Sequence, residues 1–157
     1  MTNGEPRPSL FISASLFAHS VLHGEDAAGS AAKKPARAMK IQIRIGEKKL
    51  TATMRDSATT VDFLSLLPLK LTLKDYARTE KIADLPEKLT THGAPAGSEP
   101  SAGDIAYYAP WGNLALFYKD FGDSSGLIIL EKLDSRIEVL TKFGAGNIII
   151  ERTDSHE

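Results

Sequence analysis

The chain contains no cysteine among its 157 residues. This excludes disulfide bonds, thiolate nucleophiles and metal sites with cysteine ligands. Histidine is scarce as well, since only His92 lies in the body of the chain and the other three lie near its ends. A catalytic triad or a multi-histidine site would depend on His92 alone, and the Gly/Pro-rich segment around it is typical of a solvated loop. The sequence therefore predicts no catalytic residue, no metal site and no cofactor.

A strong charge of either sign is also lacking. The chain has 19 Lys and Arg and 20 Asp and Glu, which give a formal net charge of −1. This balance gives no reason to expect nucleic acid or an anionic membrane as a partner. The longest mostly apolar run, residues 10–22, is too short and too polar for a membrane span.

Residues 1–38 differ in composition from the rest of the chain. We favour a disordered extension upstream of a translation start at Met39, which would leave the protein cytoplasmic. The alternative is that residues 1–28 act as an export signal and direct the protein to the periplasm. One folded domain is expected over residues 39–153, followed by a tail at 154–157.

Alternation of apolar and polar residues predicts strands through most of this domain. It is clearest in Ile41, Ile43 and Ile45, which are separated by polar residues. Similar or fully apolar segments occur at 50–54, 69–73, 81–83, 105–109, 114–119, 127–130 and 148–150. About eight short strands of this kind predict a mainly β fold, a closed or nearly closed eight-stranded barrel.

Two helices are expected to cover the barrel, one over about 57–67 and a shorter one over about 135–143. Asp56 or Ser57 can cap the first helix, and Pro68 ends it because proline cannot continue the hydrogen-bond ladder. Its predicted buried face comprises Val61, Phe63, Leu64 and Leu67, and its predicted outer face comprises Thr60, Asp62 and Ser65.

Six of the eleven aromatic side chains lie within residues 103–121, which are predicted to form a β-hairpin with its turn at 110–113. Neighbours on a strand point to opposite faces, so about half of these rings face the interior, with Tyr107 or Phe117 filling the barrel. A tight turn needs no indole, so Trp111 indicates exposed aromatic surface, which often marks a binding site. The predicted binding residues are Tyr76, Glu80, Tyr108, Trp111, Tyr118 and Phe121.

We expect these residues to form a mouth of the barrel together with the long loop at 90–103, because long loops inside compact domains are often functional. Glu80 could also pair with Asp84 as an acid and a base. Their four-residue spacing, close to Pro86, favours a solvated turn instead.

Three segments, 62–68, 93–97 and above all 101–113, resemble the small bacterial cyclophilin-like fold proteins. The resemblance runs from about residue 40 to residue 152 and implies an eight-stranded barrel capped by helices. True cyclophilins isomerise peptidyl-prolyl bonds with an arginine, and they carry a tryptophan and a histidine after the strand that corresponds to 114–119. Here the following segment, 119–126, contains neither residue.

The sequence therefore favours a non-catalytic domain that binds a peptide segment or a small ligand at the aromatic mouth. The alternative is a divergent peptidyl-prolyl isomerase, in which Arg78 would supply the charge and Tyr107 or Phe117 would seat the proline. This alternative depends on analogy of fold alone.

Overall fold

The structure, a computed structural model, describes residues 38–153. Most of the predicted leader and the tail at 154–157 lie outside the described residues. The elements follow in the order β1 (Met39–Ile45), β2 (Lys48–Met54), α1 (Ala58–Ser65), β3 (Leu69–Tyr76), β4 (Glu80–Asp84), β5 (Gly97–Ser98), β6 (Asp104–Tyr108), β7 (Asn113–Phe117), β8 (Ser124–Ser125), β9 (Leu127–Lys132), α2 (Ile137–Lys142) and β10 (Gly146–Thr153).

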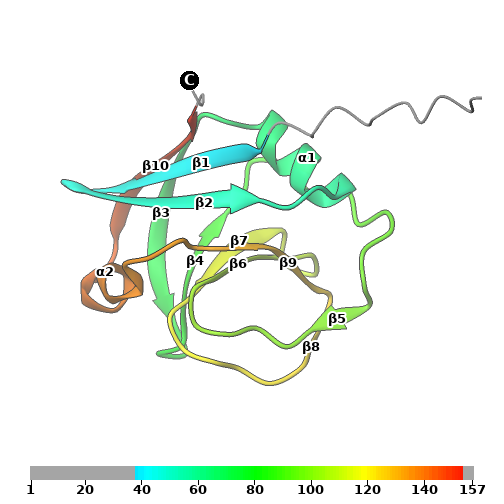
Figure 1. Cartoon of the computed structure of the whole chain (residues 1–157). Coiled ribbons are helices and arrows are strands. Elements are labelled where there is room, and N and C mark those ends of the chain that lie inside the picture. The colour runs from blue at the N-terminus through cyan, green and yellow to red at the C-terminus, as the bar shows by residue number, and fades with distance from the viewer. Residues whose placement is uncertain (1–37, 154–157) are drawn as a thin grey trace, which may run out of the picture. The chain divides into compact units, whose positions relative to one another are not determined.

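Eight strands form one antiparallel sheet in the order β2-β1-β10-β3-β4-β7-β6-β9. The two edges of this sheet meet, because Ala52 in β2 forms a β-bridge with Leu133 just beyond β9. Beside this bridge, the hydroxyl of Thr51 donates a hydrogen bond of 2.7 Å to Asp134. The sheet therefore curls into a nearly closed barrel (Figure 1), which confirms the predicted mainly β fold class.

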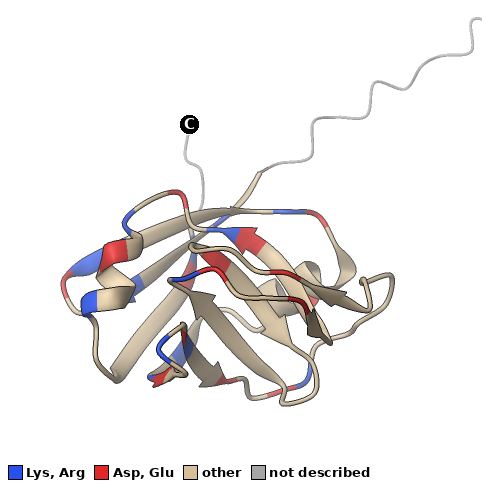
Figure 2. Cartoon of the chain, turned by 90° about the horizontal axis from the view of Figure 1, so that it is seen from below, with Lys and Arg blue, Asp and Glu red and all other residues tan. Residues whose placement is uncertain are grey.

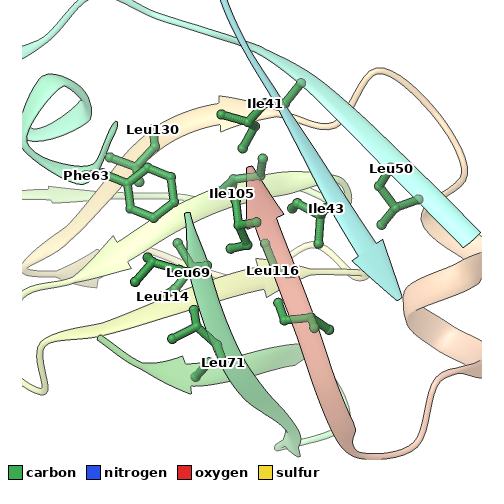
Figure 3. Close-up of a cluster of buried hydrophobic side chains, with 14 of the residues drawn as sticks. Ile41, Ile43, Leu50, Phe63, Leu69, Leu71, Ile105, Leu114, Leu116 and Leu130 are labelled. Carbon is green, nitrogen blue, oxygen red and sulfur yellow. The ribbon is translucent and has the colours of Figure 1, made fainter. Parts of the chain in front are cut away.

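One set of alternating side chains fills the barrel. Ile43 pairs with Leu50 on one side and with Ile150 on the other, and all three are fully or almost fully buried. Side chains from the opposite wall, such as Ile105 and Leu116, meet them in the interior (Figure 3). Because the side-chain period of a strand is two, this register places the whole apolar set inside. Each such side chain contributes about 1.5–3 kcal/mol through burial.

Helix α1 covers one end of the barrel, where Phe63 lies beside Leu130 (Figure 3). Its predicted cap is confirmed, since the Ser57 hydroxyl accepts a hydrogen bond of 3.1 Å from the Thr60 backbone N–H. The predicted faces are partly wrong. Thr60 is fully buried, whereas Val61 is 51% exposed.

Thr59 and Thr60 can be buried because each of their hydroxyl groups has a hydrogen-bond partner, which the pattern of apolar residues does not reveal. The Ser57 hydroxyl lies 2.9 Å from that of Thr60, and the Thr59 hydroxyl donates a bond of 2.8 Å to the Thr90 carbonyl. Buried threonines with such partners lose little from desolvation, so the helix turns its threonine side inward.

Helix α2 lies at the opposite end of the barrel from α1, near the β1–β2 turn (Figure 1). It has the short length that the sequence predicts, and Leu140 anchors it in the core. Figure 2 shows that acidic and basic residues are interspersed along the strands and loops. No helix in residues 38–153 is long and apolar enough to cross a membrane.

A second apolar set lies on the outer face of strands β4, β7, β6 and β9. It comprises Ile82, Ala106, Ala115, Phe117 and Leu127. Beside it, β5 and β8 form a separate two-stranded ribbon that lies next to β9 (Figure 1). The predicted loop at 90–103 therefore contains a short strand, which the sequence could not reveal because two residues carry no periodicity.

Candidate functional site

The aromatic hairpin is formed by β6 and β7, whose bounds lie within one or two residues of the predicted strands. Its turn closes with a bond of 2.9 Å from the Gly112 N–H to the Tyr108 carbonyl, and Gly112 adopts a φ of 69°. Such a positive φ favours glycine. The hairpin thus brings Trp111 back over the outer face of its own strands.

Strand parity divides the hairpin aromatics. Tyr107 points into the barrel, where it is 1% exposed and its hydroxyl accepts a bond of 3.1 Å from the Leu89 N–H. Tyr108 and Phe117 point to the outer face instead. Of the two candidates for filling the barrel, Tyr107 is therefore the correct one.

A pocket of about 310 Å³ lies on this outer face. It is lined by Tyr76, Ala77, Thr79, Glu80, Tyr108, Trp111, Asn113, Phe117, Phe121, Ser124, Ser125 and Leu127. Five of the six predicted binding residues are in this set. The exception is Tyr118.

Exposed aromatic rings form the walls of the pocket. The Trp111 ring stands edge-on to the rings of Tyr76 and Tyr108, with centroids 5.4 Å apart in both pairs. Of the four large apolar side chains that residues 38–153 expose, three line the pocket, namely Tyr76, Trp111 and Phe121. Exposed apolar side chains are normally scattered singly over a protein surface, so three of them in one concave site are unusual.

Glu80 is the one acidic or basic side chain among the lining residues. Burial raises the pKa of its carboxyl from the ordinary 4.5 to about 7. Within residues 38–153 it has no ion-pair partner and no side-chain hydrogen bond. Asp84 is exposed and does not line the pocket, so the two carboxyl groups do not form an acid–base pair.

Asn113 is a second polar group whose bonding is incomplete. Asn113 is 2% exposed, and its Oδ1 atom has no hydrogen-bond partner in the described part of the chain. Most buried polar atoms have a partner in the protein or in bound water. Asn113 therefore lines the pocket with a side chain whose buried oxygen makes no hydrogen bond in the described residues.

Tyr118 does not belong to the pocket. Its ring packs on the barrel interior, and its hydroxyl donates a hydrogen bond of 2.5 Å to Asp75. Asp75 also accepts a bond of 2.8 Å from the buried Lys81, which donates to the Gly144 carbonyl as well. Hydrogen bonds from Lys81 and Tyr118 lower the pKa of Asp75, and burial together with the Asp75 bond raises that of Tyr118 to about 12. This cluster joins β3 and β4 to the α2–β10 connection.

The predicted mouth of the barrel is also displaced. The pocket opens on the outer face of the sheet, and its second wall is the segment 121–125. Residues from the 90–103 loop, including the exposed His92, line a different cleft at the start of α1. No group of three or more potential metal-ligating side chains occurs in the described residues.

Seven lining residues were not among the predicted binding residues, namely Ala77, Thr79, Asn113, Phe117, Ser124, Ser125 and Leu127. Strict alternation along β7 could have found Asn113, because it shares a strand face with Phe117. The two serines carry no such signal, since pairing between β5 and β8 brings them to the pocket.

Fold and site together define a nearly closed β-barrel that carries an aromatic pocket on its outer surface. The chain belongs to the cyclophilin-like family, because a profile of that family matches residues 43–151. It is also similar to the solution structure of a hypothetical protein from Archaeoglobus fulgidus, with a TM-score of 0.56 and 16% identity over 77% of this chain and 99% of that chain. At this identity the likeness shows the fold alone. No curated protein matches the chain.

Proposed function

We propose that this cyclophilin-like barrel is a binding domain, and that its outer-face pocket holds a small ligand or a side chain of a peptide segment. The observation that carries the proposal is that most of the predicted binding residues line the same pocket. Five side chains chosen for their chemistry come from β3, β4, β6, the hairpin turn and the segment after β7, and all of them line one pocket.

The composition of the pocket supports binding. Its volume of about 310 Å³ lies at the lower end of the range for small-molecule sites, which starts at about 300 Å³. Such sites combine apolar and aromatic walls with a few polar groups that fix orientation. Here the edge-on rings of Tyr76, Trp111 and Tyr108 support one another, so little side-chain freedom is lost when a ligand enters.

The lining residues give less support to catalysis. They include no lysine, arginine, histidine or cysteine within the described part of the chain. Arg78, the charged group of the isomerase alternative, is exposed in the β3–β4 turn and does not line the pocket. Phe117 does line it and could hold a proline ring, so a peptide remains a suitable ligand.

The chain offers its own optical probe, because Trp111 is its single tryptophan. We would screen a library of small fragments and short proline-containing peptides against the full chain and follow Trp111 emission. The proposal predicts a saturable change with at least one compound.

A matched pair of variants links such a response to the pocket. Phe121 and Val61 are exposed to the same degree, 50% and 51%, but only Phe121 lines the pocket. We expect Phe121→Ala to weaken binding several-fold and Val61→Ala to leave it unchanged. A screen without any saturable response, or equal losses in both variants, would contradict the proposal.

A protease-coupled assay of prolyl isomerisation tests the alternative. With micromolar full chain, a binding domain leaves the rate at the uncatalysed background. A catalysed rate that Arg78→Ala removes would replace the binding proposal with the isomerase.

A further inference from the structure

A second cleft lies between α2 and the β1–β2 turn, at the end of the barrel that α2 covers (Figure 1). It has a volume of about 330 Å³ and shares no lining residue with the aromatic pocket. Its lining residues are Ile45, Lys48, Arg136, Glu138, Val139, Lys142 and Phe143. The two cavities are therefore separate, and the aromatic pocket does not account for this one.

The floor of the cleft is apolar and belongs to the packed part of the structure. Ile45 is buried in the core, and the side chains of Val139 and Phe143 pack against that core. A Cβ atom on Gly146 would lie 3.1 Å from the Cζ atom of Phe143, so glycine at this position lets the ring lie close to the start of β10. A ligand would therefore meet an apolar surface that is already formed.

The rim of the cleft is basic. Lys48, Arg136 and Lys142 are exposed side chains that line it, and Glu138 is the one acidic residue among the described lining residues. Within residues 38–153, none of the three basic side chains forms an ion pair. The cleft therefore holds a surplus of two positive charges, although the whole chain has a formal net charge of −1. Basic groups gathered in this way repel one another, and an anion bound among them removes the repulsion.

The basic groups come from both walls of the cleft. On the helix, Arg136 precedes Val139 by three positions and Lys142 follows it by three, and residues at this spacing share one face. On the hairpin, Lys48 pairs with Ile45 across the β1–β2 turn. Each wall thus supplies both an apolar part of the floor and a basic part of the rim.

The backbone of Arg136 gives a further indication. It adopts a φ of 68° and a ψ of 36°, a left-handed conformation that strains any residue with a Cβ atom and favours glycine. Residues held in such conformations cluster at ligand sites. A guanidinium group is also well suited to a phosphate, because it can donate two parallel hydrogen bonds to its oxygens.

We infer that this cleft binds a small phosphate monoester whose substituent is apolar or aromatic. The phosphate meets Lys48, Arg136 and Lys142, and the substituent lies on the floor formed with Phe143. A phosphate monoester carries a charge of roughly −1.5 to −2 near pH 7, which matches the surplus of two positive charges better than a single carboxylate does. The volume lies in the range of small-molecule sites, which starts at about 300 Å³. This inference concerns a second site and does not depend on the proposed function.

Matched probes test the chemistry in calorimetric titrations of the full chain. Phenyl phosphate carries both the charge and the ring, benzoate has a single charge, inorganic phosphate lacks the ring, and phenol lacks the charge. We expect saturable binding of phenyl phosphate, about tenfold weaker binding of benzoate and severalfold weaker binding of inorganic phosphate and of phenol. Absence of saturable binding at millimolar phenyl phosphate, or equal binding of benzoate, would overturn the inference. Sedimentation of the chain with phosphatidylserine vesicles, without binding of phenyl phosphate, would assign the basic rim to a membrane surface and overturn it as well.

Charge variants assign the binding to the rim. Lys48→Gln and Lys142→Gln should each weaken phenyl phosphate binding about two- to fivefold. The exposed Lys49 follows Lys48 in β2 but does not line the cleft, so Lys49→Gln is the matched control and should leave the affinity unchanged. Glu138→Gln removes the acidic group and should tighten binding about twofold, a change that a loss of structure would not produce. Equal losses in the control and in Lys142→Gln, or weaker binding by Glu138→Gln, would contradict the assignment.

Arg136→Gly separates binding from folding. It removes the guanidinium group and relieves the strained backbone, so phenyl phosphate binding should weaken several-fold while the urea midpoint stays the same or rises. Unchanged affinity in this variant would overturn the inference. Phe121→Ala, in the aromatic pocket, should leave phenyl phosphate binding intact. If Phe121→Ala weakens it instead, the ester lies in the aromatic pocket, so this inference fails while the proposed function stands.

Discussion

Replacing Glu80 with glutamine should stabilise the protein, and it should do so increasingly as the pH rises. The pKa of this carboxyl is raised from 4.5 to about 7 by burial. Between these two values the folded chain therefore holds a proton that the unfolded chain has lost. Stability from the protonated form is fully present below about pH 4.5, and it is lost as the pH rises through about 7.

The size of the effect follows from the same two values. A pKa change from 4.5 to about 7 corresponds to roughly 3 kcal/mol at most. Because the side chain is only partly buried, solvent screening reduces this figure, and we expect about 1–2 kcal/mol. Glutamine has a similar shape and does not titrate, so Glu80→Gln is spared this loss.

Urea denaturation followed by circular dichroism at pH 5, 6, 7 and 8 measures the effect. The stability advantage of Glu80→Gln over the wild-type chain should grow by about 1–2 kcal/mol across this range, a midpoint change of roughly 0.5–1 M urea. Glu87→Gln, on an exposed residue outside the pocket, should show no trend. A difference that stays flat with pH, or one that favours the wild-type chain at pH 8, would refute the reasoning.

Three further predictions concern the barrel and the ribbon beside the pocket, and urea denaturation measures the change in stability for each. A Cβ atom on Gly97 would lie 2.7 Å from the Ser124 carbonyl oxygen, so Gly97→Ala should lower the free energy of unfolding by about 1–3 kcal/mol and weaken ligand binding. A Cβ atom on Gly122 would have no neighbouring atom within 4 Å, so Gly122→Ala should change neither quantity. Tyr107→Phe leaves a buried backbone N–H without its partner and should cost about 1–3 kcal/mol. Phe63→Ala should cost about 3–5 kcal/mol and Val61→Ala about 0.5 kcal/mol or less; equal costs would contradict the observed orientation of α1.

Local periodicity predicted much of the fold. Ile41, Ile43 and Ile45 alternate with polar residues, and this suffices to fix which face of β1 is buried. The hairpin residues Tyr107 and Tyr108 divide between the interior and the outer face for the same reason. Pattern therefore identified the barrel and five of the lining residues.

What periodicity could not predict depends on pairing between distant segments. Alternation places Tyr118 on the face opposite Phe117, but the sequence does not show that the pairing of β3, β4 and β7 brings Asp75 to its hydroxyl there. The displacement of the pocket to the outer face has a similar origin. It follows from the β5–β8 ribbon, which holds Ser124 and Ser125 beside the sheet through pairing with residues more than twenty-five positions earlier.

The most direct test of the pocket as the binding site is a two-dimensional ¹H–¹⁵N NMR titration of the full chain with a compound that gives a saturable change in Trp111 emission. The indole N–H of Trp111 and the side-chain amide of Asn113 report on it from within, and the backbone N–H of Glu80 reports on its charged end. The account predicts that these three signals move together and saturate at one concentration. Saturable shifts confined to other faces of the barrel, with these three signals unmoved, would contradict it.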